Sequence, residues 1–330
     1  MEHERLNSPD TSAILLEVLG HQLHFSQDPN SKHLGTTVWD ASMVLVKFLQ
    51  EKNSRKGRFS ASKLKGKRVI ELGAGCGVAG FGMAMLGCDV VSTDQAEVLP
   101  LLMRNAERNS SRVTQVNPDN FGSIEVAELD WGNMDHVRAV CPPFDFVIGT
   151  DVVYSENLLE PLLHTILSLS GPKTTILLGY EIRSTNVHEQ MLELWKRNFE
   201  VKIVPRSKMD SKYQHPSIQL FAMSLKPSET GKTDSQNNGA GTDQIISREV
   251  EDCNSDDTGV DELKDFDVAE EVDNENTGVD ELKDFDVAEE VDNENVPIPS
   301  NLNDIEKLTE WETRRYGAMA ARLLRDVKIT

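Results

Sequence analysis

The sequence predicts an α/β domain built on a seven-stranded, mostly parallel sheet, and three observations support this prediction. Residues 1–226 alternate short strand-like stretches with helix-like stretches, the pattern of strands joined by helical crossovers. A glycine-rich turn follows the first strand of the series. The last two strand-like stretches are joined only by Arg206 to Pro216, which is too short for a helical crossover. We therefore expect five parallel strands, an antiparallel hairpin at the sheet edge, and helices on both faces.

Each element is located by its own residue pattern. Short apolar runs rich in β-branched residues are expected to be strands, at 68–73, 89–94, 124–129, 144–150, 174–181, 199–205 and 217–225. Stretches with apolar residues at helical spacing lie between them, at 78–86, 97–109, 157–169 and 187–198. A further helix at 38–50 precedes the first strand, and an N-terminal extension precedes that helix.

Charge is distributed unevenly along the chain. The net charge of the 330 residues is −21, but residues 227–300 alone hold 24 Asp and Glu against 4 Lys and Arg. The remaining residues therefore carry a net charge of about −1. The acidity belongs to a tail. The near-neutral region before it lacks the basic patch that a nucleic-acid substrate requires.

Three regions follow from this composition: a domain at 1–226, an acidic tail at 227–300 and a terminal helix at 301–330. The tail holds a 19-residue unit, 258–276, repeated without change as 277–295, and we expect it to be disordered because it offers little to bury. The last region is expected to form an amphipathic helix that either docks on the domain or is marginal alone. Its apolar face would comprise Tyr316, Met319, Ala320, Leu323 and Val327.

Cysteine and histidine usage gives no sign of a metal site. The four cysteines form no C-x-x-C pair, and only His21 and His24 of the eight histidines lie close together. The cysteines are expected to be reduced thiols, and the sequence shows no secretion signal and no run of about 18 apolar residues. These features favour a cytoplasmic protein, possibly nuclear as well. We expect no membrane or metal partner. We expect a monomer.

The glycine-rich turn at 73–77 follows an apolar strand that contains Glu71. Glycines at such a turn let the backbone approach a nucleotide-like cofactor, and Gly75-x-Gly77-x-x-Gly80 also satisfies the dinucleotide fingerprint. Asp94 ends the next strand, where an acid can bind ribose hydroxyls or cap the following helix. Because a carboxylate at Glu71 would repel a pyrophosphate, the turn favours S-adenosylmethionine over a dinucleotide.

Two further segments follow the third and fourth strands, Leu129-Asp130-Trp131-Gly132 and Thr150-Asp151-Val152-Val153-Tyr154. With them, the chain resembles the seven-stranded protein-lysine methyltransferases of methyltransferase family 16, in which L-x-W-G and D-x-x-Y segments follow those strands. The resemblance covers about residues 14–225. It extends to Val38-Trp39-Asp40-Ala41, Pro100-Leu101-Leu102 with Asn105, and Tyr180-Glu181-x-Arg183.

The resemblance implies a Rossmann-like methyltransferase fold and S-adenosylmethionine as cofactor. It places Asp94 on the ribose hydroxyls, Trp131 beside the adenine and Asp130 on the adenine amino group. The full cofactor set expected is Trp39, Glu71, Gly73, Ala74, Gly75, Asp94, Asp130, Trp131 and Thr150. For Trp39 and Trp131, core packing is the alternative.

The acceptor residues expected are Asp151 and Tyr154. Methyl transfer to an amine needs an aligned, neutral nitrogen, so Asp151 would orient the lysine amine or hold its proton, and Tyr154 would supply a channel wall. Alternatively, Asp151 caps helix 157–169 and Tyr154 belongs to the core.

The expected substrate is a protein lysine. The spacing of Pro205, Lys208, Asp210 and Tyr213 resembles family members that methylate an AAA ATPase, so an AAA ATPase or a chaperone-like protein is the expected partner. Two other readings remain open: a methyltransferase for a small amine, and a catalytically inactive interaction protein.

Overall fold

The computed structural model describes residues 13–28, 31–52, 59–116 and 121–227. The expected repeat-containing tail beyond 227 and the expected helix at 301–330 lie outside the described residues. Within the described part of the chain, no helix is long and apolar enough to cross a membrane.

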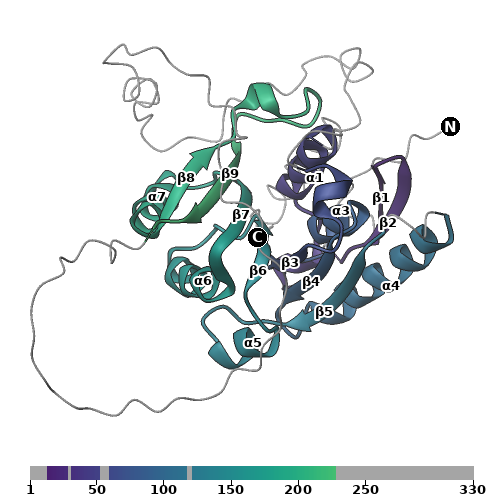
Figure 1. Cartoon of the computed structure of the whole chain (residues 1–330), viewed down its shortest axis with the longest axis horizontal. Helices are drawn as coiled ribbons and strands as arrows, with labels where there is room; N and C mark the ends of the chain where they lie inside the picture. Colours follow the sequence, from purple (N-terminus) through teal and green to yellow (C-terminus); the bar gives the residue numbers. More distant parts are fainter. Residues whose placement is uncertain (1–12, 29–30, 53–58, 117–120, 228–330) are drawn as a thin grey trace, which may run out of the picture. The chain divides into compact units, whose positions relative to one another are not determined.

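A seven-stranded sheet forms the centre of the domain, in the order β5-β4-β3-β6-β7-β9-β8 (Figure 1). The strands are β3 (Arg68–Leu72), β4 (Asp89–Asp94), β5 (Ser123–Glu128), β6 (Phe144–Thr150), β7 (Ser170–Glu181), β8 (Phe199–Ile203) and β9 (Ile218–Leu225). The first five in spatial order are parallel, and β9 pairs antiparallel with both β7 and β8. The expected α/β fold with an antiparallel hairpin at the edge is confirmed.

Helices cover both faces of this sheet. On one side lie α1 (Asp40–Lys52), α3 (Val78–Met85) and α4 (Leu99–Val116), and on the other lie α5 (Met134–Ala139), α6 (Glu156–Leu169) and α7 (Thr185–Asn198) (Figure 1). Short helical turns occur at η1 (Leu34–Thr36), α2 (Ala61–Leu64) and η2 (Arg206–Lys208). α5 was not predicted from the sequence, and α4 continues past residue 109, where the helix was expected to end.

The N-terminal extension contains a hairpin of β1 (Ala13–Val18) and β2 (His21–Ser26), which was not expected from the sequence. Its two-residue turn has positive φ at Leu19 and Gly20, the conformation that suits tight hairpins. Asn105 of α4 fixes the hairpin, because its side chain accepts the Ser26 N–H at 2.8 Å and donates to the Ser26 and Cys76 carbonyls. Asn105 thereby connects the hairpin to the glycine-rich turn.

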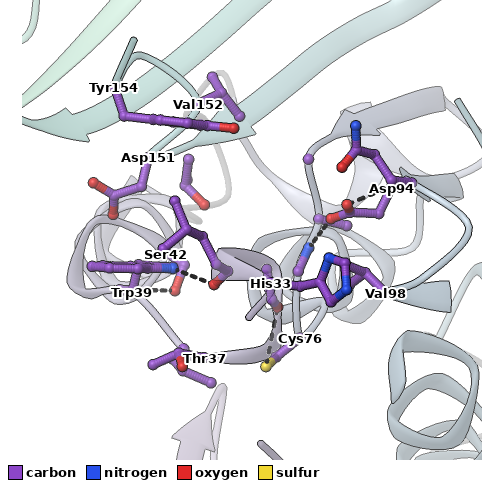
Figure 2. A pocket seen from close by; sticks show the side chains of 18 of the residues that line it. His33, Thr37, Trp39, Ser42, Cys76, Asp94, Val98, Asp151, Val152 and Tyr154 are labelled. Carbon is purple, nitrogen blue, oxygen red and sulfur yellow. Dashed lines mark hydrogen bonds between the residues drawn. The ribbon is translucent and has the colours of Figure 1, made fainter. Parts of the chain in front are cut away.

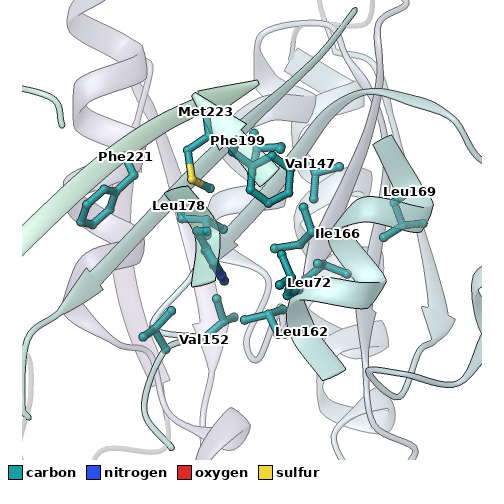
Figure 3. Packing of buried hydrophobic residues seen from close by; sticks show 14 of the residues in the cluster. Leu72, Val147, Val152, Leu162, Ile166, Leu169, Leu178, Phe199, Phe221 and Met223 are labelled. Atoms are coloured by element: carbon teal, nitrogen blue, oxygen red, sulfur yellow. The ribbon is translucent and has the colours of Figure 1, made fainter. Parts of the chain in front are cut away.

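One half of the core lies between the sheet and α5–α7. Figure 3 shows Leu72 and Val147 of the central strands facing Leu162 and Ile166 of α6. Each fully buried side chain of this type contributes roughly 1.5–3 kcal/mol through removal of apolar surface from water. This packing holds the carboxyl ends of β3 and β6 in fixed positions, and those ends carry the candidate site.

Candidate active site

A cavity of about 650 Å³ opens at the carboxyl edge of the parallel strands, within the size range of sites for small molecules. Its walls come from the segment before α1 and from the turns that follow β3, β4, β5 and β6. Figure 2 shows Asp94 and His33 on one side, with Trp39, Asp151 and Tyr154 on the other. Eight of the nine predicted cofactor residues line this cavity: Trp39, Gly73, Ala74, Gly75, Asp94, Asp130, Trp131 and Thr150.

The glycines of the turn are required by close neighbours. A Cβ on Gly75 would lie 2.8 Å from the Gly35 carbonyl oxygen, and the φ of +58° is unfavourable for other residues. A Cβ on Gly73 would lie 2.9 Å from Val152 and 3.1 Å from the Trp131 ring. Bare backbone at this turn therefore keeps the floor of the cavity open.

Asp94 joins the ends of β3 and β4 at this floor. Its Oδ2 accepts the Gly75 N–H at 2.7 Å and its Oδ1 accepts the Gln95 N–H at 2.8 Å. Burial raises the pKa of this carboxyl, and the two N–H donors oppose that rise. Since α4 begins only at Leu99, Asp94 does not cap it, and its carboxylate remains available at the cavity for ribose hydroxyls.

Glu71 is the predicted cofactor residue that does not reach the cavity. Its carboxylate accepts the Gly80 N–H at 2.9 Å and the Ser92 hydroxyl at 2.6 Å, beneath the glycine-rich turn. Burial raises its pKa to about 7. Direct contact with a cofactor was therefore the wrong expectation, and the side chain instead fixes the start of α3 to β4.

Trp131 and Asp130 follow β5. The half-buried Trp131 ring covers Gly73, as an adenine-side wall requires, so it is not core packing alone. Asp130 and the half-buried His136 lie beside Glu128, in a group with the residue types of a metal site. However, His136 Nδ1 accepts the Asp130 N–H at 3.1 Å, so a neutral ring carries its proton on Nε2, the nitrogen that a metal would need. The histidine thus shapes the turn after β5.

Asp151 has positive φ, +54°, and its carboxylate is buried. Oδ1 accepts the Glu181 N–H and forms an ion pair with Arg183, both at 3.1 Å, while Oδ2 accepts the Ala41 N–H of α1 at 3.3 Å. Burial raises its pKa, and the Arg183 charge opposes this most strongly. The alternative that Asp151 caps the helix at 157–169 is wrong, because its contacts go to α1 and β7.

Tyr154 stands at the rim of the cavity and is 45% exposed, so it is not a core residue. Partial burial and the nearby Asp94 charge raise its pKa, which keeps the hydroxyl protonated at neutral pH. Figure 2 shows the ring extending over the cavity. Its position suits a wall of the acceptor entrance.

The lining fits a cofactor that combines an adenosine group with a charged amino-acid group. An aromatic wall at Trp131, a carboxylate at Asp94 that can accept hydrogen bonds from hydroxyl groups, and open backbone at Gly73 to Gly75 are the groups such a molecule requires. Comparison with known proteins agrees: a family model described as lysine methyltransferase matches residues 18–198. The chain belongs to the lysine methyltransferase family. S-adenosylmethionine is the cofactor of that family and of this site.

Named relatives place this lysine methyltransferase among enzymes that act on proteins. Protein N-lysine methyltransferase METTL21A of Danio rerio is 36% identical over 180 residues, 54% of this chain and 74% of the relative. EEF1A lysine methyltransferase 3 of Mus musculus is 32% identical over 189 residues, 57% and 74% of the two chains. A solved structure, the T. thermophilus 16S rRNA N2 G1207 methyltransferase RsmC with AdoMet and guanosine, aligns with a TM-score of 0.44. It is 17% identical over 65% of this chain and 50% of that chain.

Several lining residues of the lysine methyltransferase were not predicted as site residues. Arg183 appeared only as part of a motif, although its guanidinium reaches both Asp151 and Trp39. His33, Leu34 and Gly35 precede α1 and reach the cavity because the chain folds back over the glycine-rich turn. The glycine-rich turn at 73–77 gives no signal for such a distant segment, whereas the Arg183 motif could have suggested a partner for Asp151.

Proposed function

We propose that the chain methylates a lysine side chain on the surface of another folded protein, with Asp151 and Tyr154 receiving the lysine. The observation that carries this proposal is the position of Tyr154, an exposed aromatic residue at the entrance of the cofactor cavity, next to the buried carboxylate of Asp151. An acceptor that enters past Tyr154 comes from outside the protein, as a protein-borne lysine does.

S-adenosylmethionine supplies an electrophilic methyl group, and the chain supplies alignment and exclusion of water. Tyr154 and Trp39 offer aromatic faces to the lysine stem and to its cationic head. Asp151 Oδ2 accepts the Ala41 N–H and retains acceptor capacity that could orient the incoming nitrogen. A partly desolvated entrance lowers the pKa of the lysine, so that the neutral nucleophile becomes accessible near neutral pH.

The substrate protein proposed is an AAA ATPase or a chaperone-like partner with an acidic surface near its lysine. The loop between β8 and β9 presents Arg206, Lys208 and Lys212, whose side chains form no hydrogen bond or ion pair with the described residues. The loop ends at Ser217, whose hydroxyl donates to Glu181 at the cavity side of β7. Its positive charges therefore lie on the same edge of the sheet as the entrance. We propose a monomeric cytoplasmic enzyme, possibly also nuclear, without nucleic acid, membrane or metal.

Incubation of the enzyme with labelled cofactor and cell lysate tests this function. A labelled protein band supports a protein substrate, and label confined to small molecules supports the alternative of a small amine. Absence of any cofactor binding by calorimetry would support the alternative of an inactive interaction protein.

A further inference from the structure

Arg183 contacts both sides of the acceptor region, the end of β7 and the segment before α1. Its Nη1 lies 3.1 Å from Asp151 Oδ1, and its Nη2 donates to Glu181 Oε2 at 3.0 Å. The guanidinium carbon lies 4.8 Å from the centre of the Trp39 ring. A single planar cation thus spans from the end of β7 to the segment before α1.

The burial of its two carboxylate partners distinguishes the Arg183 arrangement from a surface ion pair. The Asp151 side chain is only 3% exposed, and Glu181 is 11% exposed, so solvent screens the interaction weakly. Glu181 is itself held by the Ser217 hydroxyl at 3.1 Å. A guanidinium can serve two carboxylates and an aromatic face together, whereas an ammonium group is a point charge.

We propose that Arg183 is a positioning residue for methyl transfer: it holds the Asp151 carboxylate ionised and in place while it braces the Trp39 ring. The inference rests on the proposed lysine transfer for its consequence in catalysis. Its structural part is independent of that transfer. Asp151 accordingly serves as a fixed charge that orients the amine, because its Oδ1 is already engaged by Arg183 and the Glu181 N–H.

Removing the Arg183 charge leaves Asp151 facing Glu181 and Asp40, two carboxyl groups that raise its pKa further. The carboxyl of Asp151 would then stay protonated to a higher pH in the folded protein. A raised folded-state pKa gives a stability contribution that is present at low pH and is lost as the pH rises through that pKa. The penalty of Arg183→Gln should therefore grow with pH.

The test measures the melting temperature from pH 5 to 8.5 for the full chain and three variants: Arg183→Gln, Arg183→Lys, and Arg183→Gln with Asp151→Asn. We expect the gap between wild type and Arg183→Gln to widen with pH, by about 3 °C for each unit of rise in the Asp151 pKa. The difference in melting temperature from wild type should be smaller for Arg183→Lys than for Arg183→Gln, because the lysine side chain restores the positive charge. The double variant should show no widening, because asparagine does not titrate.

Transfer of label from the methyl-labelled cofactor to a lysate protein band is the second readout. Arg183→Gln should lower turnover by about 10-fold or more and move the acid limb of its pH profile to higher pH, whereas Arg183→Lys should restore the limb. Arg197→Gln on the exposed face of α7 is the matched control and should behave as wild type. A gap that is constant with pH, or an unmoved acid limb, overturns the proposal. If wild type labels nothing, the proposed function fails, and the melting curves still decide the role of Arg183.

Discussion

Asp94 Oδ2 accepts the backbone N–H of Gly75 at 2.7 Å, so a carboxylate from the end of β4 closes the glycine-rich turn that follows β3. The same side chain lines the cofactor cavity. One residue therefore shapes the turn and presents a carboxylate to the cavity, and its replacement should affect both the turn and the binding of a ligand there.

Asp94→Ala should weaken binding of S-adenosylmethionine by about 10-fold to 100-fold, because hydrogen bonds between a carboxylate and two hydroxyls contribute about 1.5–3 kcal/mol. Isothermal calorimetry measures this. Asp135→Ala, at an 85% exposed side chain on α5, is the matched control. Unchanged affinity in Asp94→Ala, or binding of NADH in place of S-adenosylmethionine, would refute the assignment.

Tyr154→Ala, which removes the aromatic wall of the acceptor entrance, should lower turnover by about 10-fold or more with little change in cofactor affinity or melting temperature. The hydroxyl forms no hydrogen bond to the described residues, and the residue is 45% exposed, so its loss leaves the fold intact. Single-turnover transfer to a labelled lysate band measures the effect. Equal rates for the variant and the wild type would remove Tyr154 from the acceptor site.

Asp151→Asn should also depress turnover more than cofactor affinity, but it should destabilise the domain as well. It removes the buried partner of the ion pair with Arg183, but the guanidinium is 33% exposed and keeps Glu181, so the cost should fall below the roughly 3–5 kcal/mol of a fully buried pair. Denaturant unfolding gives the stability, and calorimetry gives the cofactor affinity. A variant with wild-type turnover would show that the carboxylate serves α1 and β7 alone.

Glu71 links stability to pH. Its folded-state pKa, about 7, lies above the ordinary value of 4.5, so its contribution is complete below about 4.5 and is lost as pH rises through about 7. Up to about 3 kcal/mol follows from that difference. Glu71→Gln should flatten the decline in melting temperature between pH 5 and 8. The same slope in variant and wild type would mean that Glu71 does not titrate in this range.

Much of the fold was predictable because its signals are local. The strand that ends at Leu72 and the glycine-rich turn after it lie within ten residues. The connection before Ile218 is too short for a helical crossover, so the strand that follows it had to be antiparallel to the one before it. The β1–β2 hairpin was missed, although Leu19-Gly20 between alternating apolar residues is a turn signal.

Site details that depend on distant contacts could not be read from the sequence. Eight of the nine expected cofactor residues line the cavity, since strand ends bring them to one edge of the sheet. The expected contact of Glu71 with the cofactor was wrong, because strand alternation alone does not say which face of the strand meets α3. The Gly80 N–H of α3 donates to the Glu71 carboxylate. The partnership of Asp151 with Arg183 joins residues 32 positions apart, and no spacing rule encodes it.

Deletion of residues 227–300 should leave transfer to a small amine-bearing peptide and the melting temperature nearly unchanged. The segment holds 24 acidic against 4 basic residues and little to bury. It should alter labelling of lysate proteins at low salt, and the difference should fade at high salt because screening acts beyond about 10 Å. A large loss of peptide methylation or of thermal stability would show that the segment is structural.

Transfer of methyl label to a protein lysine is the decisive measurement for this enzyme. Wild type, Asp94→Ala and Tyr154→Ala are incubated with methyl-labelled S-adenosylmethionine and lysate, and the protein fraction is hydrolysed and analysed for methylated lysine. We expect methyl-lysine in a discrete protein band with wild type and strongly reduced label with both variants. Label that appears only in small molecules would refute a protein substrate, and equal protein label with all three enzymes would refute the roles of Asp94 and Tyr154.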